Sequence, residues 1–269
     1  MHNYRTKKFL SYLVIIIILM AGLIFLFRGT LVDHLFGSVG QLENEPNLAS
    51  KQNQSEIDRF LDQDQANSLT KVIDYSSPNF NGTTLSTEQG GWQKLASRDL
   101  LGRPGEANAL LTKSMMPPAQ KDKPRERLTV KTPGYRVIKT ADGYLYNRCH
   151  IIGYQLTGLN NEPRNLFTGT RQLNASYVGN PMNSMQFFED EVAQYLKNHP
   201  DDYVRYRVKP IYQHLELVPR GVEMEAQSVK GKSIKFHVFI PNVQQGYQIN
   251  YWTGYAGQQP TKKRHMPHT

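Results

Sequence analysis

The chain has 269 residues, and its 32 Lys and Arg against 23 Asp and Glu give a formal net charge of +9. This excess of basic side chains favours a polyanionic partner such as nucleic acid, or an anionic cell envelope. The single cysteine excludes an intramolecular disulfide, and the scattered histidines lack the paired Cys/His spacing of a zinc site.

An apolar run without charged residues covers residues 9–27 and is long enough to cross a bilayer as one helix. Basic residues precede it, so residues 1–8 are expected to be a cytoplasmic basic segment and everything after Arg28 to lie outside. A cleaved secretory signal is the alternative, but its apolar core is normally about 7–15 residues long and ends near a small-residue cleavage site. No such site follows Phe27. We therefore expect a single-pass signal anchor in the cell membrane, with secretion after signal cleavage as the alternative.

Residues 28–70 are polar and weakly patterned, which is typical of a stalk, with a short helix expected at residues 55–61. Residues 71–255 are long enough to form one domain with its own core. Residues 256–269 form a basic tail that contains Lys262, Lys263 and Arg264.

Within the domain, residues 92–102 are expected to form a strand or turn and residues 106–113 a short helix ended by Pro117 and Pro118. The turn signal Asp142-Gly143 predicts a ribbon of two strands, residues 135–138 and 145–150. Residues 184–198 have the apolar spacing of an amphipathic helix. Further strands are expected at residues 203–209, 222–227, 234–240 and 247–252. The fold class is therefore α+β with a mainly antiparallel sheet.

The candidate site surrounds His150, at the end of the second strand of the expected ribbon. A neutral imidazole can take a proton from water near pH 7. Arg148 lies two residues earlier, so both side chains project from the same face of the strand, and a guanidinium there can bind phosphate. Downstream, Asn174 and Glu189 offer the oxygen ligands that suit a magnesium ion.

The run Asn147-Arg148-Cys149-His150 resembles the Asp-Arg-Gly-His motif of the DNA/RNA non-specific endonucleases, the ββα-metal or His-Me finger class. The run Asn165-Leu-Phe-Thr-Gly-Thr-Arg-Gln-Leu-Asn174 resembles the second block of that family, including the spacing between its two asparagines. The resemblance covers residues 72–254. It extends to the membrane-bound nucleases of Gram-positive bacteria that act in DNA uptake.

The resemblance implies that His150 is the general base, that Arg148 contacts phosphate and that Asn174 is the direct metal ligand. It also implies that Asn165 orients the site and that Glu189 holds metal-bound water. The implied fold contains a ββα-metal active-site element, and the implied cofactor is Mg²⁺, with Mn²⁺ as a substitute.

Two residues depart from the family motif: Asn147 stands where the family has Asp, and Cys149 where it has Gly. A lost carboxylate could weaken the orientation of the metal or of His150. Cys149 requires a backbone conformation that a residue with a side chain can adopt. The histidine, the arginine and the downstream asparagines are retained.

Each candidate residue also has a structural interpretation. Asn165 could cap the segment that follows it, and Glu189 could belong to a solvated acidic helix face. Arg205 and Arg207 could bind phosphate or form the outer face of a half-buried strand. A Cys149–His150 dyad is disfavoured because adjacent residues on a strand face opposite ways. The sequons at Asn81 and Asn174 are short patterns and carry little weight.

The function expected from the sequence is a membrane-anchored, outward-facing endonuclease that cuts double- and single-stranded DNA, and RNA as well, with little sequence preference. No small-molecule cofactor is expected, and the sequence does not predict an oligomeric state. The competing hypothesis is a non-catalytic surface receptor for DNA, in which Asn147 and Cys149 mark a weakened site.

Overall fold

The computed structural model describes residues 61, 72–74, 77–118, 125–141, 143–175 and 184–259. All of them belong to one unit, Glu43–Thr269. The expected anchor at residues 9–27, all of the stalk except Leu61, and most of the basic tail lie outside the described residues, as does Asp142 of the predicted turn. Across the described part of the chain, none of the helices has the length and apolar character needed to span a membrane.

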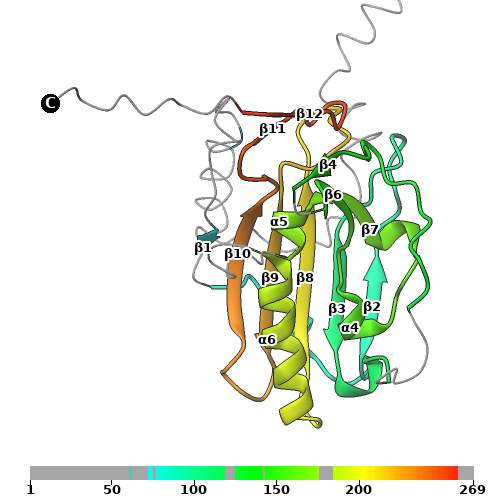
Figure 1. The fold of residues 1–269 in the computed structure, drawn as a ribbon. Coiled ribbons are helices and arrows are strands. Elements are labelled where there is room, and N and C mark those ends of the chain that lie inside the picture. Colours follow the sequence, from blue (N-terminus) through cyan, green and yellow to red (C-terminus); the bar gives the residue numbers. More distant parts are fainter. Residues whose placement is uncertain are drawn as a thin grey trace, which may run out of the picture. The chain divides into compact units, whose positions relative to one another are not determined.

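A six-stranded antiparallel sheet forms the centre of the described domain, with the strand order β1-β10-β9-β8-β3-β2 (Figure 1). This architecture confirms the predicted α+β class with a mainly antiparallel sheet. The strands expected near residues 92, 203, 222 and 234 are present. The bounds are β1 Ile73–Asp74, β2 Trp92–Leu95, β3 Ala107–Leu111, β8 Val204–Ile211, β9 Gly221–Ser228 and β10 Lys235–Pro241.

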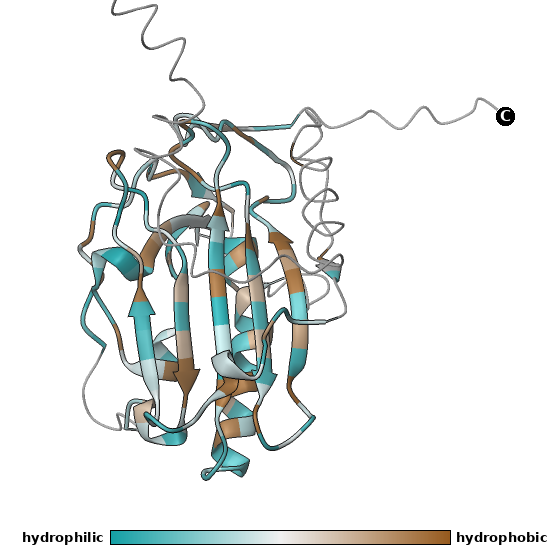
Figure 2. Cartoon of the chain, turned by 180° about the vertical axis from the view of Figure 1, so that it is seen from behind, coloured by the Kyte–Doolittle hydropathy of each residue, from teal (hydrophilic) through white to brown (hydrophobic). Residues whose placement is uncertain are grey.

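One helix, α6 at Met185–Asn198, lies along one face of this sheet, as its apolar spacing predicts (Figure 1). Its buried side chains, among them Val192 and Leu196, share a core with Val204, Tyr206 and Val208 of β8. Side chains alternate along a strand, so the residues between these three project from the opposite face. Figure 2 shows the sheet from that opposite side, with hydrophilic and hydrophobic residues alternating along several strands.

The prediction of a helix at residues 106–113 is wrong, because most of this segment forms strand β3. Every residue of β3 is buried, between β2 on one side and β8 on the other. A short apolar run fits a buried strand as well as a buried helix. Here the segment is a strand because it pairs with β2 and β8 inside the sheet.

The expected ribbon is only partly correct. Strand β4, Lys139–Thr140, pairs with β5, Gly143–Tyr144, on the two sides of the predicted turn. The strand that carries His150, β6 at Tyr146–His150, instead pairs with β7 at Leu166–Thr170. All five residues of β7 are buried, so β7 gives β6 a partner inside the core that the exposed segment before β4 does not offer.

Smaller elements complete the domain. Helices α4, Tyr154–Thr157, and α5, Arg171–Asn174, flank the β6–β7 ribbon, and the hairpin β11–β12, Tyr247–Ile249 with Ala256–Gln258, lies near the C-terminal end of the described chain. A second, smaller apolar cluster joins this hairpin to the start of β6; its buried members are Leu145, Tyr146, Val218, Ile249 and Tyr251.

A network of ionic groups covers the sheet face away from α6. The Nε2 atom of His237 lies 2.6 Å from a carboxylate oxygen of Glu223 and 3.5 Å from one of Glu225. Glu225 is also paired with Arg207. The Nδ1 atom of His237 lies 3.1 Å from the carbonyl oxygen of Ser77, so the network fastens the segment before β2 to the sheet. Burial opposes a charged imidazole here, but the two carboxylates outweigh it and raise the pKa of His237.

Replacing His237 by Gln should therefore lower the free energy of unfolding by about 1.5–3 kcal/mol, the usual contribution of a hydrogen bond to a charged group. Because the pKa of His237 is raised in the folded state, its contribution is complete below about pH 6.5 and is lost as pH rises through the folded-state value. Urea unfolding at several pH values measures this. A wild-type advantage that grows between pH 6 and pH 9 would contradict it.

Candidate active site

His150 is the last residue of β6, and its ring is half-buried at the edge of the loop that follows. Its Nε2 atom lies 2.7 Å from the carbonyl oxygen of Asn160. A carbonyl oxygen only accepts, so Nε2 carries the proton and Nδ1 keeps its lone pair. Burial lowers the pKa of His150 to about 4; the Asn160 carbonyl opposes this shift and the charge of Arg125 adds to it. The ring is therefore neutral at pH 7.

Among the described residues, Arg125 is the cation in contact with this ring, and the sequence analysis did not identify it. Its Nη2 atom lies 3.1 Å from Nε2 and 3.4 Å from Nδ1 of His150. Its Nε donates to the side-chain oxygen of Asn160 at 2.6 Å, and its guanidinium lies over the Tyr154 ring at 4.2 Å. The available signal was the alternation of basic residues at positions 121, 123, 125 and 127, but spacing alone does not show which of them reaches the site.

Two further residues that sequence reasoning missed hold the Arg125 segment in place. The amide of Asn160 donates to the Glu126 carbonyl at 2.9 Å. The side-chain oxygen of Asn161 accepts from the backbone N–H groups of Thr129 and Val130 at 3.0 and 3.2 Å. The loop after α4 thus positions both the Nε2 side of His150 and the chain that carries Arg125.

Asn165 is fully buried at the end of a 3-10 turn, Pro163–Asn165. Its side-chain oxygen accepts from the Ile152 N–H at 2.9 Å, and its amide donates to the Ile152 carbonyl at 3.0 Å. These bonds run back to the chain just after His150 and do not cap the following segment. Asn165 therefore fixes the backbone around His150, which agrees with the orienting role that the resemblance implies.

Arg148 shares a strand face with His150, as the alternation predicts. Its Nε donates to the Val130 carbonyl at 2.6 Å, and its guanidinium lies over the Tyr135 ring at 4.3 Å. The side chain is half-buried. These contacts set its direction, and its role toward phosphate stays a prediction.

Glu189 is half-buried on α6, whereas Asp190 and Glu191 are exposed. Burial raises its pKa to about 8, Asp190 adds to this rise, and the charge of Arg125 opposes it. The carboxylate lies against Gly153, so a Cβ atom at that position would have to displace the end of the Glu189 side chain. Glu189 is therefore distinct from the solvated acidic face.

Asn174 ends the short helix α5, which Thr170 caps by accepting from the Leu173 N–H at 3.0 Å. Helix α5 contacts β6, β7 and α6. The elements that carry His150, Asn174 and Glu189 therefore lie next to one another. Among the described residues, Asn174 and Glu189 form no side-chain hydrogen bond or ion pair, so their oxygens are available to a cation.

The arginines of β8 do not support the expectation of phosphate binding. Arg205 is 4% exposed, and its guanidinium donates to the carbonyl of Tyr206 at 2.8 Å and to the side chain of Asn108 at 2.5 Å. Arg207 is paired with Glu225. Both lie on the sheet face away from the β6–β7 ribbon, because the intervening β8 residues pack with the ribbon's core. Their internal partners favour the structural interpretation of these two arginines, and their contact with substrate stays a prediction.

Cys149 is fully buried in the main core, with Gly169 against its sulfur. Burial raises the pKa of its thiol. No residue of β6 has a positive φ angle, so Cys149 adopts its place without strain. The position excludes a thiolate nucleophile, in agreement with the sequence analysis.

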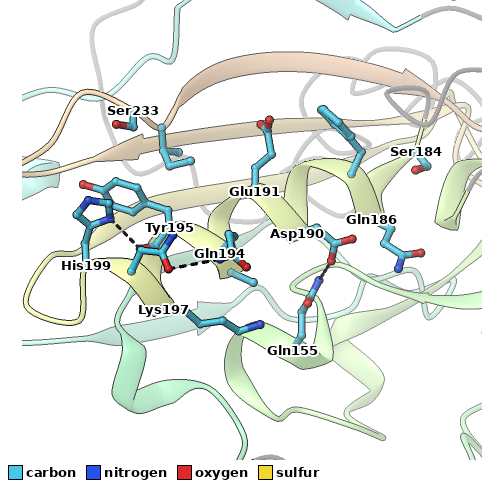
Figure 3. A pocket seen from close by; sticks show the side chains of 14 residues that line it. Gln155, Ser184, Gln186, Asp190, Glu191, Gln194, Tyr195, Lys197, His199 and Ser233 are labelled. Atoms are coloured by element: carbon cyan, nitrogen blue, oxygen red, sulfur yellow. Dashed lines mark hydrogen bonds between the residues drawn. The ribbon is translucent and has the colours of Figure 1, made fainter.

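Two other features of the described residues lie apart from His150. One group of three side chains could share a metal ion: Glu223, Glu225 and His237. Within this group, Nε2 of His237 and the Glu223 carboxylate already form a hydrogen bond of 2.6 Å. A pocket along the outer side of α6 contains a hydrogen bond from Gln155 to Asp190 at 2.7 Å (Figure 3). Neither His150 nor Glu189 lines it.

A family model described as DNA/RNA non-specific endonuclease matches residues 83–230, more than half of the chain. A deoxyribonuclease from Streptococcus dysgalactiae subsp. equisimilis is 34% identical over 116 residues, which are 43% of this chain and 34% of that relative. The chain thus spans about a third of that relative's length.

Solved structures are similar too. NucA from Streptococcus agalactiae with a magnesium ion bound aligns with a TM-score of 0.61 at 24% identity, over 78% of this chain and 97% of that chain. The Sda1 nuclease with a bound zinc ion aligns with a TM-score of 0.53 at 27% identity, over 63% of this chain and 81% of that chain.

Replacing Arg125 by Ala should raise the pKa of His150 from about 4 toward its ordinary value, because the change removes a nearby positive charge and exposes the ring. Arg127→Ala, two residues along the same segment, is the matched control and should leave this pKa unchanged. A histidine NMR titration measures both variants. Equal shifts in the two would show that Arg125 does not act on His150 directly.

Proposed function

This chain belongs to the DNA/RNA non-specific endonuclease family, and on that premise we propose that it is a metal-dependent endonuclease. It would hydrolyse phosphodiester bonds of DNA, and of RNA as well, with little sequence preference. The observation that carries this proposal is the state of His150. Its ring is neutral, its Nε2 is held by the Asn160 carbonyl, and its Nδ1 keeps a lone pair beside Arg125.

These residues can divide the work of hydrolysis. Nδ1 of His150 takes a proton from the water that attacks phosphorus, and the Asn160 carbonyl stabilises the imidazolium that results. The new P–O bond forms as the bond to the 3′ oxygen breaks. Arg125 lies beside the ring and Arg148 projects from the same strand face as His150; in this proposal their guanidinium groups hold non-bridging phosphate oxygens.

Asn174 and Glu189 fit the metal that this chemistry requires. The amide oxygen and the carboxylate are hard ligands, and neither has a side-chain partner within the described residues. Burial and the nearby Asp190 raise the pKa of Glu189 although Arg125 opposes the rise, and a divalent ion beside it would favour its charged form. A divalent ion held by Asn174, with Glu189 acting through water, would supply positive charge to the transition state and the leaving oxygen. The zinc in the Sda1 nuclease supports a divalent ion; we propose Mg²⁺, with Mn²⁺ as a substitute.

Plasmid digestion tests the activity. We expect supercoiled DNA to be nicked and linearised with Mg²⁺ and to stay intact with EDTA. His150→Ala should reduce turnover by about 10²–10⁴, the usual contribution of a general base, while DNA binding persists. A wild-type chain that binds plasmid without cutting it in any divalent ion would favour the non-catalytic receptor instead.

The two metal-site residues should behave differently when replaced. Asn174→Ala removes the direct ligand, so we expect cutting to be lost even at high magnesium. Glu189→Gln keeps the shape and removes the charge, so a partial loss that added magnesium partly restores is expected. Magnesium titrations of cleavage rate distinguish the two. Equal defects that metal rescues equally would reverse our assignment.

We also propose that residues 9–27 anchor the enzyme in the cell membrane, with its N-terminus in the cytoplasm and the nuclease domain outside. The support is the uncharged apolar run and the basic residues before it. DNA uptake, scavenging and destruction of extracellular DNA are all compatible with this location.

Protease added to intact cells should remove the nuclease domain, because the proposed topology exposes it. The measurement is nuclease activity and antibody detection on cells before and after treatment. Fully active soluble protein in the medium, with a new N-terminus near Arg28, would establish a cleaved signal instead.

A further inference from the structure

Exposed aromatic rings lie on the turn between β11 and β12, outside the residues that the family model matches. Trp252 is 49% exposed and Tyr255 is 62% exposed. Exposed rings of this size offer flat apolar faces against which a ligand can pack. We call residues 250–255 the aromatic turn.

The aromatic turn is held rigidly from below. Tyr251 is buried, its hydroxyl donates to the Asn242 carbonyl at 2.9 Å, and its own carbonyl accepts from the N–H groups of Leu217 and Val218 at 3.0 Å. Gly254 has φ +76°, and its Cα lies so close to the backbone of Gly134 that a Cβ would collide there. The rings are therefore presented on a fixed backbone, which lowers the entropic cost of binding.

The turn is cationic as well as aromatic. The Arg136 guanidinium lies 4.4 Å from the centre of the Tyr255 ring, and its Nε donates to the Thr253 carbonyl at 3.2 Å. The chain contains no Asp or Glu after Glu225. Glu216, which precedes the segment bonded to Tyr251, is buried and paired with Arg220 at 2.6 Å. A negatively charged ligand would meet no exposed carboxylate from the turn itself.

A strained residue supports the Trp252 side of the turn. His214 has φ 43°, the one positive φ of a non-glycine residue among those described. Its ring lies 6.5 Å from the Trp252 ring at an interplanar angle of 15°. Arg103 donates to the His214 carbonyl at 2.9 Å and helps to hold this conformation. Strain kept in place by its surroundings is common at binding sites.

We infer that the aromatic turn binds unpaired nucleotides of single-stranded DNA or RNA as a subsite of the nuclease. This inference rests on the function proposed above. Bases stack on exposed aromatic rings only when a duplex does not cover their faces, and Arg136 can contact the adjacent phosphate. Tyr251 packs in the same cluster as Tyr146, and His150 follows Tyr146 by four residues along β6, a strand rise of about 13 Å. The aromatic turn and His150 therefore belong to neighbouring elements of one domain.

Tryptophan fluorescence tests this contact directly, because Trp92 and Trp252 are the two tryptophans of the chain. In a full-length Trp92→Phe variant, kept in nonionic detergent with EDTA to prevent cutting, Trp252 reports alone. Single-stranded dT15 should quench its emission, and a 15-base-pair duplex should do so much less at equal concentration. Absence of quenching, or equal quenching by both, would overturn the inference.

Kinetics provide a second test. Trp252→Ala and Tyr255→Ala should each raise KM for single-stranded DNA about fivefold or more, in line with the usual contribution of base stacking. Neither should change kcat, nor the rate on bis(p-nitrophenyl) phosphate, which has no base. Tyr203→Ala is the control, because Tyr203 directly precedes the first residue of β8 and lies outside the aromatic turn. This variant should leave KM unchanged.

The outcomes separate the two proposals. If the wild type cleaves neither plasmid nor the small diester, the proposed nuclease function fails. If it cleaves both and the two variants keep the wild-type KM for single strands, only the subsite is wrong. A blue shift of Trp252 emission on phosphatidylserine vesicles, without quenching by dT15, would assign the turn to the membrane surface instead.

Discussion

The paired hydrogen bonds between the Asn165 side chain and the backbone of Ile152 are the constraint on which the site depends. They join the start of β7 to the chain just beyond β6, inside the protein, where an unsatisfied amide would be costly. With the backbone fixed on both sides, the alternation of β6 turns Cys149 into the core and His150 toward the loop. The same few bonds thus determine both the packing of the ribbon and the direction of the His150 ring.

The pKa values of His150 and Glu189 follow from their burial and from the charges next to them. Burial and the Arg125 charge keep the His150 ring neutral, which a base requires, while burial and Asp190 raise the pKa of Glu189. The charge of Arg125 acts on both groups, because it lowers the pKa of His150 and opposes the rise at Glu189. A divalent ion beside Glu189 would further favour its charged form.

The spacing of apolar residues predicted much of this fold, because it indicates which face of a helix or strand is buried. The apolar spacing of α6 gave its bounds closely, and the alternation in β8, β9 and β10 identified three strands of the sheet. The same reasoning failed at β3, where a strand buried on both faces has no alternation to read. It also failed for the partner of β6, since strand pairing depends on contacts distant in sequence.

The candidate site residues also differ in how far the sequence alone could identify them. His150, Asn165 and Glu189 were found because their motif or spacing lies within one stretch of chain. Arg125 was missed because it reaches His150 through a loop that Asn160 and Asn161 hold, and no local pattern shows this. The alternation of β8 shows that Arg205 lies opposite the core residues, but it does not show the internal partners that bind its guanidinium here.

The burial of Cys149 has a consequence for chemical durability. Oxidants and thiol reagents attack the thiolate of an accessible cysteine, and this thiol is both protonated and enclosed between Gly169 and the core. The sole sulfhydryl of the chain is therefore protected from peroxide and from cross-linking to other proteins. The chain can in this way carry a cysteine directly before His150 without exposing that cysteine to oxidation.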